Sequence, residues 1–149
     1  METDCQRAMN WLFGHGGVMK DEKAGFALLK PLAENGNAEA QTALGWCFDH
    51  GQGTDKDEKQ AVQWYRKAAE QSHAQAQYNL AVCFDQGRGV DKDERQAVAW
   101  YRIAAEQGSV NAQFALGVCL DLGHGVDKDE KQAALWYSKA AEQGHAVAQ

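Results

Sequence analysis

The sequence has little of what β-structure, nucleic-acid binding or binding to a membrane surface would require. Proline occurs once, at Pro31, and the alanine-rich chain of 149 residues has no run of β-branched residues. This composition is typical of an all-α protein. Lysine and arginine number 15 against 21 acidic residues, giving a formal net charge of −6. Because nucleic acids and anionic lipids attract clustered basic side chains, the charge argues against both as partners.

Long apolar runs and a targeting segment are also missing. The uninterrupted apolar stretches span only a few residues, whereas a membrane-spanning helix requires roughly 20. The chain begins Met-Glu-Thr-Asp-Cys, with acidic residues where a secretory signal carries basic ones, and no apolar segment follows. We therefore expect a soluble protein without membrane insertion, located in the cytoplasm or delivered into a host.

An internal repeat of 36 residues organises almost the whole chain. Trp-Tyr pairs begin at positions 64, 100 and 136, and Asp-Lys-Asp-Glu tetrads begin at positions 55, 91 and 127. No linker interrupts this period, so we expect residues 1–149 to form a single repeat domain. Its copies are three full repeats (38–73, 74–109 and 110–145), a degenerate N-terminal repeat (2–37) and a partial repeat (146–149).

Each full repeat has the pattern of two helices. In the first of them, small and apolar residues recur at helical spacing between Ala40 and Phe48, which predicts a first helix with one buried face. The Gly-Gln-Gly segment at 51–53 predicts the end of that helix. Asp57 can cap a second helix, with Gln60 completing a capping box, and both residues recur in the later repeats.

The second helix is expected to bury a stripe of aromatic and small residues. A glycine or serine at positions 36, 72, 108 and 144 then turns the chain into the next repeat. A single helical hairpin cannot bury both of its faces, so the repeats must stack into an all-α solenoid. The predicted stripe is Ala61, Trp64, Tyr65, Ala68 and Ala69.

The two ends of this array are expected to differ. Pro31 lies within the second helix of the degenerate repeat and is expected to kink or end it. At the other end, the last second helix around Trp136 and Tyr137 has no complete following repeat. We expect a frayed end there, open to homo-association with another copy of the chain.

Three segments of the first full repeat resemble the Sel1-like repeat. They are Ala-x-Ala-Gln-x-x-Leu-Gly at 38–45, Gly-x-Gly-Thr at 51–54 and Trp-Tyr-x-x-Ala-Ala-Glu-Gln at 64–71, with copies 36 and 72 residues later. The resemblance implies a right-handed α/α superhelix of about four repeats, related to tetratricopeptide repeats, with the first helices lining a concave face. It also implies a scaffold for protein–protein contacts, in bacteria often in host interaction, secretion or envelope functions. Some members of the family are described as binding or hydrolysing β-lactams.

The cysteines depart from the pattern of secreted, cysteine-rich members of that family, which carry two cysteines per repeat. Here each full repeat has one, at Cys47, Cys83 and Cys119. Equivalent positions on successive first helices are expected about 8–10 Å apart, whereas the Cα atoms of a disulfide lie within about 7 Å. We therefore expect small buried thiols and a reducing compartment. Cys5, near the terminus, is expected to be the most reactive thiol.

A second stripe on each first helix remains after the packed positions are removed, and the resemblance places it on the concave face. Each repeat carries an aromatic residue and an aspartate there, which suit a partner peptide with apolar and basic side chains. The alternative is that the aromatics pack on the neighbouring first helix and the aspartates are merely solvated. The predicted groove residues are Trp46, Asp49, Tyr78, Val82, Asp85, Phe114, Val118 and Asp121.

Other motifs give no support for catalysis, a metal or a cofactor. The five histidines fall mostly in turns, and no two are spaced three or four residues apart as a helical metal site requires. The acidic tetrads lack the twelve-residue calcium loop, and the three serines stand in no hydrolase motif. We therefore expect no catalytic residue, no metal and no cofactor.

Together these patterns predict a non-enzymatic module that binds a peptide segment of a partner protein in its concave groove. Two alternatives stay open. One is a self-assembling structural repeat module. The other, suggested only by the family resemblance, is a β-lactam-binding or hydrolysing enzyme.

Overall fold

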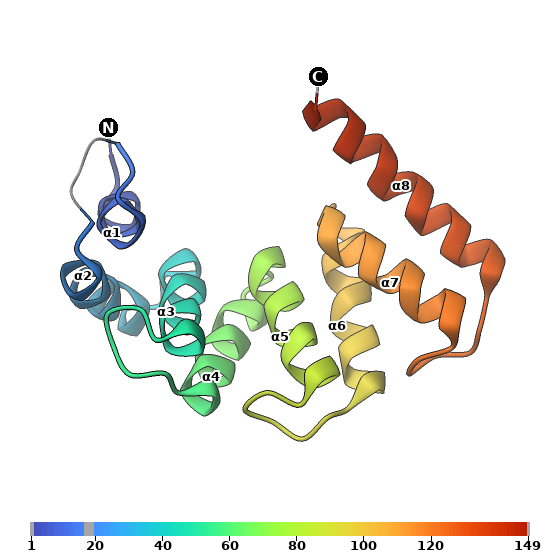
Figure 1. Ribbon diagram of the computed structural model, residues 1–149, viewed down its shortest axis with the longest axis horizontal. Helices are drawn as coiled ribbons and strands as arrows, with labels where there is room; N and C mark the ends of the chain where they lie inside the picture. Colours follow the sequence, from blue (N-terminus) through green and yellow to red (C-terminus); the bar gives the residue numbers. More distant parts are fainter. Residues whose placement is uncertain (1, 17–19, 149) are drawn as a thin grey trace. The chain divides into compact units, whose positions relative to one another are not determined.

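The computed structural model describes residues 2–16 and 20–148, and all regular secondary structure in these residues is α-helical (Figure 1). The chain divides into two compact units, residues 1–73 and 74–149. The first unit contains α1 (Asp4–Phe13), α2 (Glu22–Glu34), α3 (Ala38–His50) and α4 (Glu58–Glu70). The second contains α5 (Ala74–Gln86), α6 (Glu94–Glu106), α7 (Val110–Leu122) and α8 (Glu130–Ala148).

Both units are built from helical hairpins. In the first unit the hairpins are α1–α2 and α3–α4, and α2 also packs against α3. In the second unit they are α5–α6 and α7–α8, and α6 packs against α7 (Figure 1). Each hairpin corresponds to one 36-residue repeat of the sequence, so the first helix of a repeat contacts both its own second helix and the preceding one within each unit.

Aspartate caps begin the second helices, as the sequence predicts. The Asp57 carboxylate accepts hydrogen bonds from the backbone and side-chain amides of Gln60, both at 3.1 Å. The side-chain bond first, and the backbone bond next, lower the pKa of Asp57 below its usual value. This confirms the predicted aspartate cap. The reciprocal bond of a capping box does not form, because the Asp57 backbone amide donates instead to the Phe48 carbonyl at 2.7 Å. The same aspartate-to-amide bond begins α2, α6 and α8, from Asp21, Asp93 and Asp129.

The glycines of the loop within each repeat have two different roles. Gly123 ends α7 in the left-handed region with φ of 71°, and its amide bonds to the Cys119 carbonyl, as expected of a helix stop. The second glycine of the loop, Gly125, lies against the preceding repeat. A Cβ atom there would stand 2.3 Å from the Glu94 carbonyl oxygen in the first turn of α6. Glycine at this position therefore allows neighbouring repeats to touch, a role that the sequence did not indicate.

The buried faces largely match their prediction, with one exception. The stripe from Ala40 to Phe48 is buried in α3, as are the alanines and Tyr65 of the stripe in α4. Trp64 is only half-buried, and the Lys67 ammonium lies 4.4 Å from its ring centroid. The prediction of a fully buried Trp64 is therefore wrong, because this residue lies at the edge of the arc that faces the neighbouring helices.

Two predictions about helix ends are also wrong. Pro31 does not end α2, which continues to Glu34. Proline removes one N–H donor from the helix, but the turn that follows it still forms, and the Pro31 carbonyl accepts a bond from the Asn35 amide at 3.0 Å. Gly144 does not turn the chain, because α8 continues through it to Ala148.

The four cysteines are free thiols, and all are buried. The structure does not single out Cys5 as the most reactive thiol, because this residue is only 4% exposed and is buried like the other three. Burial first, and the Glu39 carboxylate second, raise the pKa of Cys5 to about 11. Burial likewise raises the pKa of Cys47 to about 12. Thiols with such values stay protonated at neutral pH and are poor nucleophiles.

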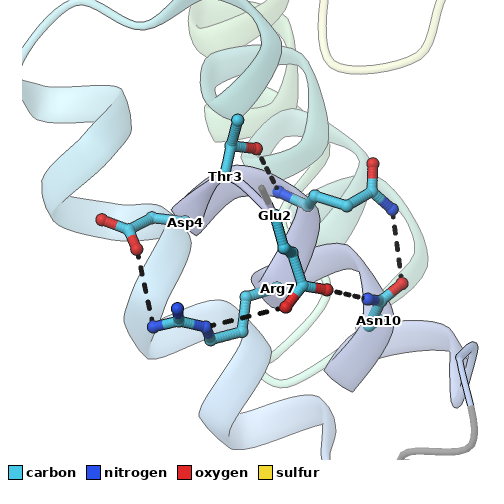
Figure 2. A network of polar contacts seen from close by, with 6 residues as sticks. Glu2, Thr3, Asp4, Arg7 and Asn10 are labelled. Atoms are coloured by element: carbon cyan, nitrogen blue, oxygen red, sulfur yellow. Dashed lines mark hydrogen bonds and ion pairs between the residues drawn. The ribbon is translucent and has the colours of Figure 1, made fainter.

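The degenerate first repeat carries a network of exposed polar contacts on α1 (Figure 2). The Arg7 guanidinium lies 4.0 Å from the Glu2 carboxylate and 3.5 Å from that of Asp4. The Asn10 side chain donates a further hydrogen bond to Glu2. Exposed pairs of this kind contribute little to stability, but a polar outer surface is typical of a capping repeat.

Candidate functional site

Two of the predicted groove residues line one hollow in the unit 74–149. Tyr78 from α5 and Phe114 from α7 border it together with Tyr137 from α8, and its volume is about 690 Å³. We call this hollow the α7 groove. Small and polar residues complete its lining: Val110, Asn111, Ala115, Ala140 and Ala141.

The first-helix aromatic side chains that line the α7 groove contact tyrosine rings of the second helices. The ring of Tyr78 lies 5.8 Å from that of Tyr101, at an interplanar angle of 44°. The ring of Phe114 lies 5.5 Å from that of Tyr137, at 50°. Each first-helix aromatic therefore rests on the second-helix tyrosine of its own repeat. Phe114 nevertheless remains 58% exposed, so its ring offers apolar surface to a ligand.

Two of the predicted aspartates accept hydrogen bonds from tyrosines of the second helices. The Tyr65 hydroxyl donates to the Asp49 carboxylate at 3.3 Å, and the Tyr101 hydroxyl donates to that of Asp85 at 3.4 Å. Burial, and then the Asp85 carboxylate, raise the pKa of Tyr101, so its hydroxyl stays protonated and remains a donor. The recurrence of aspartate thus has a structural cause, because a buried tyrosine hydroxyl needs an acceptor.

The three predicted aspartates differ in how much of each residue is exposed to solvent. Asp49 is 8% exposed and held by Tyr65, which leaves little of its carboxylate for a ligand. Asp85 is partly exposed, and Asp121 is exposed. In the last repeat, partial burial and then the Asp121 carboxylate raise the pKa of Tyr137. Of the three, Asp121 has the carboxylate most open to a positively charged partner.

The remaining predicted residues follow the same two first helices. Phe114, Val118 and Asp121 stand four and three residues apart on α7, so they share one face of the helix over two turns. Val118 is half-buried between the exposed Phe114 and Asp121. On α5 the equivalent face carries Tyr78, Val82 and Asp85.

Trp46 packs in a different cluster, within the unit 1–73. Its ring lies 5.1 Å from Phe13, edge to face, and 4.1 Å from His50, stacked. Phe13 in turn lies 5.7 Å from the ring of His15. The predicted groove residues are therefore divided between the two units: Trp46 and Asp49 in the first, and the other six in the second.

A chain of glutamines, which sequence reasoning missed, links the hairpins within each unit. The buried Gln113 of α7 donates to the Ala105 carbonyl at the end of α6 at 3.1 Å, and accepts from Gln143 of α8 at 2.9 Å. A glutamine recurring every 36 residues within an otherwise apolar stripe is the signal that could have indicated it. The first unit repeats the arrangement with Gln41, Ala33 and Gln71.

His73 differs from the expectation that the histidines face solvent in turns. It is half-buried, with Nδ1 2.9 Å from the Thr42 hydroxyl oxygen. That hydroxyl donates to the Ala38 carbonyl at 2.9 Å, so a neutral His73 is the donor to Thr42. Burial lowers the pKa of His73, opposed by the Glu39 carboxylate. This histidine therefore makes a structural contact.

Residues 2–16 and 20–148 contain no candidate metal site and no candidate membrane span. Within these ranges, no three His, Cys, Asp or Glu side chains are grouped so that they could hold a metal ion. None of the helices in the same ranges combines the length and the apolar character needed to cross a membrane.

One protein family matches this chain. The Sel1 repeat profile matches residues 4–37, 38–73, 74–109 and 110–145. A search of curated proteins found no match.

Solved structures of bacterial proteins are similar to this chain. A protective antigen of uropathogenic Escherichia coli with an SLR fold has a TM-score of 0.88 and 38% identity, covering 95% of this chain and 30% of that one. A Sel1 repeat protein from Oxalobacter formigenes has a TM-score of 0.88 and 32% identity. The match covers 97% of this chain and 57% of the Oxalobacter chain. This chain thus spans less than two thirds of the length of either protein.

A third solved structure is also similar to this chain. It is the cysteine rich protein B of Helicobacter pylori, with a TM-score of 0.66 and 26% identity, covering 87% of this chain and 92% of that one. The helix order and these matches confirm the predicted class, an all-α solenoid with repeats of 36 residues.

Proposed function

This chain belongs to the Sel1 repeat family, and we propose that it binds a peptide segment of a partner protein in the α7 groove. Sel1 repeat proteins generally act as scaffolds for protein–protein contacts, and the family is not enzymatic. No feature of the described residues favours the β-lactam alternative, and we do not propose it.

The observation that carries the proposal is the exposed Phe114 beside an apolar hollow. Phe114, 58% exposed, leaves apolar surface in water. Fully burying an exposed side chain of this kind contributes roughly 1.5–3 kcal/mol, so covering Phe114 contributes a part of that. Tyr78 and Tyr137 border the same hollow, so an apolar ligand side chain would contact three aromatic rings. Clustered aromatic contacts of this kind are typical of the residues that dominate binding energy in interfaces.

The charge beside the α7 groove favours a basic group on the ligand. Asp121 is exposed and lies seven residues after Phe114 on α7, which is about 10 Å along the helix axis. An extended peptide covers that distance in about three residues. We therefore expect the ligand to carry an apolar side chain and, about three positions away, a lysine or arginine that faces Asp121.

A random peptide library displayed against the full chain tests this proposal. We expect the enriched peptides to share an apolar and a basic residue about three positions apart. In fluorescence polarisation, Phe114→Ala should weaken binding of these peptides about tenfold or more. Asp121→Asn should weaken it severalfold and reduce its dependence on salt.

The matched control is Leu135→Ala, which removes an exposed apolar side chain of α8 that does not line the α7 groove. It should leave peptide affinity unchanged, and circular dichroism should show wild-type helix content for all variants. Peptides that bind wild type and Phe114→Ala equally well would place the site elsewhere. A library that yields no peptide with apolar and basic side chains would overturn the proposal.

A further inference from the structure

The second helix of the last full repeat, α8, departs on its outer side from the second helices of the other two full repeats, α4 and α6. Four positions spaced i, i+4, i+7 and i+11 share one side of a helix. In α8 a leucine and a serine occupy the middle two, where α4 has Gln63 and Arg66 and α6 has Ala99 and Arg102. We call the four α8 residues the α8 stripe: Lys131, Leu135, Ser138 and Glu142.

The α8 stripe is fully open to solvent. All four of its side chains are exposed, and Leu135 is 64% exposed. None of them lines the α7 groove. Lys131 and Glu142 stand eleven residues apart, about 16 Å along the axis, so they cannot pair with each other. Leu135 therefore offers exposed apolar surface between a cation and an anion that do not pair with each other.

We propose that two copies of this chain associate through the α8 stripe, with the two α8 helices antiparallel about a two-fold axis. In this arrangement Lys131 of one copy faces Glu142 of the second copy, and Leu135 packs over Ser138 of the second copy. The two-fold axis repeats both contacts, as it must in an isologous interface. The occupant is a second copy because the stripe is complementary to itself: its charges are opposite and equidistant from its centre, and its large apolar residue faces its small one.

The centre of the stripe explains why α8, and not α4 or α6, has this property. The end charges are present in all three helices, as Lys59 and Glu70 in α4 and as Arg95 and Glu106 in α6. The same antiparallel pairing of α4 would bury two arginines, one from each copy, against glutamine. Taking charged groups out of water is costly. With leucine and serine at the centre, the contact is apolar and the helices can approach closely.

The size of the contact sets its expected strength. The α8 stripe extends over about three turns of a single helix. A contact of this kind is smaller than the interfaces of stable complexes, which bury roughly 1,200–2,000 Å². We therefore expect a weak, reversible dimer.

Charge reversal combined with analytical ultracentrifugation tests the proposal. The wild-type chain should change from monomer to dimer as concentration rises from about 1 μM to about 1 mM. K131E alone, or E142K alone, places like charges opposite each other at both ends and should weaken association at least tenfold. An equimolar mixture of the two variants should associate again, because in the mixed dimer every acidic side chain faces a lysine.

Two further variants separate the stripe from other surfaces. The double variant L135Q/S138R restores the residues found in α4 and should stay monomeric. Glu106→Lys, at the equivalent end position of α6, is the matched control and should leave association unchanged. A monomer at every concentration of wild type would overturn the proposal. A dimer that persists in both single charge variants, or that is lost on Phe114→Ala, would also overturn it, because the contact would then lie elsewhere.

Discussion

Serine at position 72 adopts a backbone conformation that the equivalent positions assign to glycine. Its φ is 68°, and among the described residues no other non-glycine has a positive φ. The equivalent residues Gly36 and Gly108 have φ of 98° and 100°. A Cβ atom at Gly108 would meet nothing within 4 Å. Any cost of a side chain in this turn is therefore conformational and not steric.

Exchanging the two residue types measures that cost. A non-glycine residue in the left-handed region costs about 1–2 kcal/mol, partly offset because glycine loses more entropy on folding. Ser72→Gly should raise the free energy of unfolding by about 0.5 kcal/mol, and Gly108→Ser should lower it by about 1 kcal/mol. Urea denaturation followed by circular dichroism measures both. A lower urea midpoint for Ser72→Gly would contradict the conformational argument.

The sequence predicts which residues are buried better than it predicts their polar partners. Ala40, Leu44 and Cys47 follow directly from apolar spacing, and the structure buries all three. The bond from Tyr65 to Asp49 could not be predicted, because the two residues lie on different helices and sixteen positions apart. Only the packing angle of the hairpin brings the hydroxyl to the carboxylate. Exposure of Trp64 was missed for a similar reason, since helical spacing alone does not set the width of the buried arc.

Helices are the level at which the sequence is most informative. The start of α6 illustrates this, because one aspartate satisfies the free amide of Gln96 and fixes where the helix begins. Helix ends are less predictable. α8 continues through Gly144, because a glycine permits a turn without requiring one.

The cap of α6 also gives a pH-dependent prediction. Hydrogen bonds from Gln96 lower the pKa of Asp93 in the folded chain, whereas in an unfolded chain an aspartate has a pKa of about 3.9. The cap therefore stabilises the fold above about pH 4, and this contribution is lost as the pH falls through the lower folded value. Asp93→Ala should lower the urea midpoint at neutral pH, and the difference from wild type should shrink in strong acid.

The control for this prediction is Asp91→Ala, two residues earlier in the same loop, where the side chain is exposed and caps no helix. It should leave the midpoint unchanged at every pH. An equal effect of the two substitutions would show that loop charge, and not the cap, is responsible.

At the scale of the molecule, each unit holds together through contacts between successive repeats. Gly123 and Gly125 both have positive φ, 71° in each case. They differ in surroundings, because a Cβ atom at Gly123 would stand 3.4 Å from a lysine side chain, and one at Gly125 would stand 2.3 Å from the Glu94 carbonyl oxygen. The second position is therefore where the α7–α8 hairpin meets α6.

Alanine at these two glycines separates backbone conformation from contact between repeats. Gly123→Ala should cost about 1 kcal/mol from backbone conformation alone. Gly125→Ala should cost about 3 kcal/mol, because the new methyl group also forces the loop away from α6. Denaturation curves of the two variants give the comparison. Equal losses for both would mean that the loop moves freely and does not couple the repeats.

The candidate site could be predicted only in part. The sequence placed Tyr78 and Phe114 on one predicted face, and the structure brings them to one hollow. It did not indicate Tyr137 or Ala140, because these residues come from α8 and reach the α7 groove only through the angle of the last hairpin. That the α7 groove binds a peptide stays a prediction.

The glutamine chain has a consequence for how the length of such a protein can change in evolution. Gln41 and Gln71, which bond to each other, belong to one repeat, and Gln41 also bonds to the Ala33 carbonyl of the repeat before it. A duplication of one complete 36-residue segment therefore brings both the new donor and the new acceptor. Recombination between repeats can add or delete whole copies without leaving an amide unpaired, whereas an insertion within a helix that displaces one of these glutamines from its partner would break the chain of bonds.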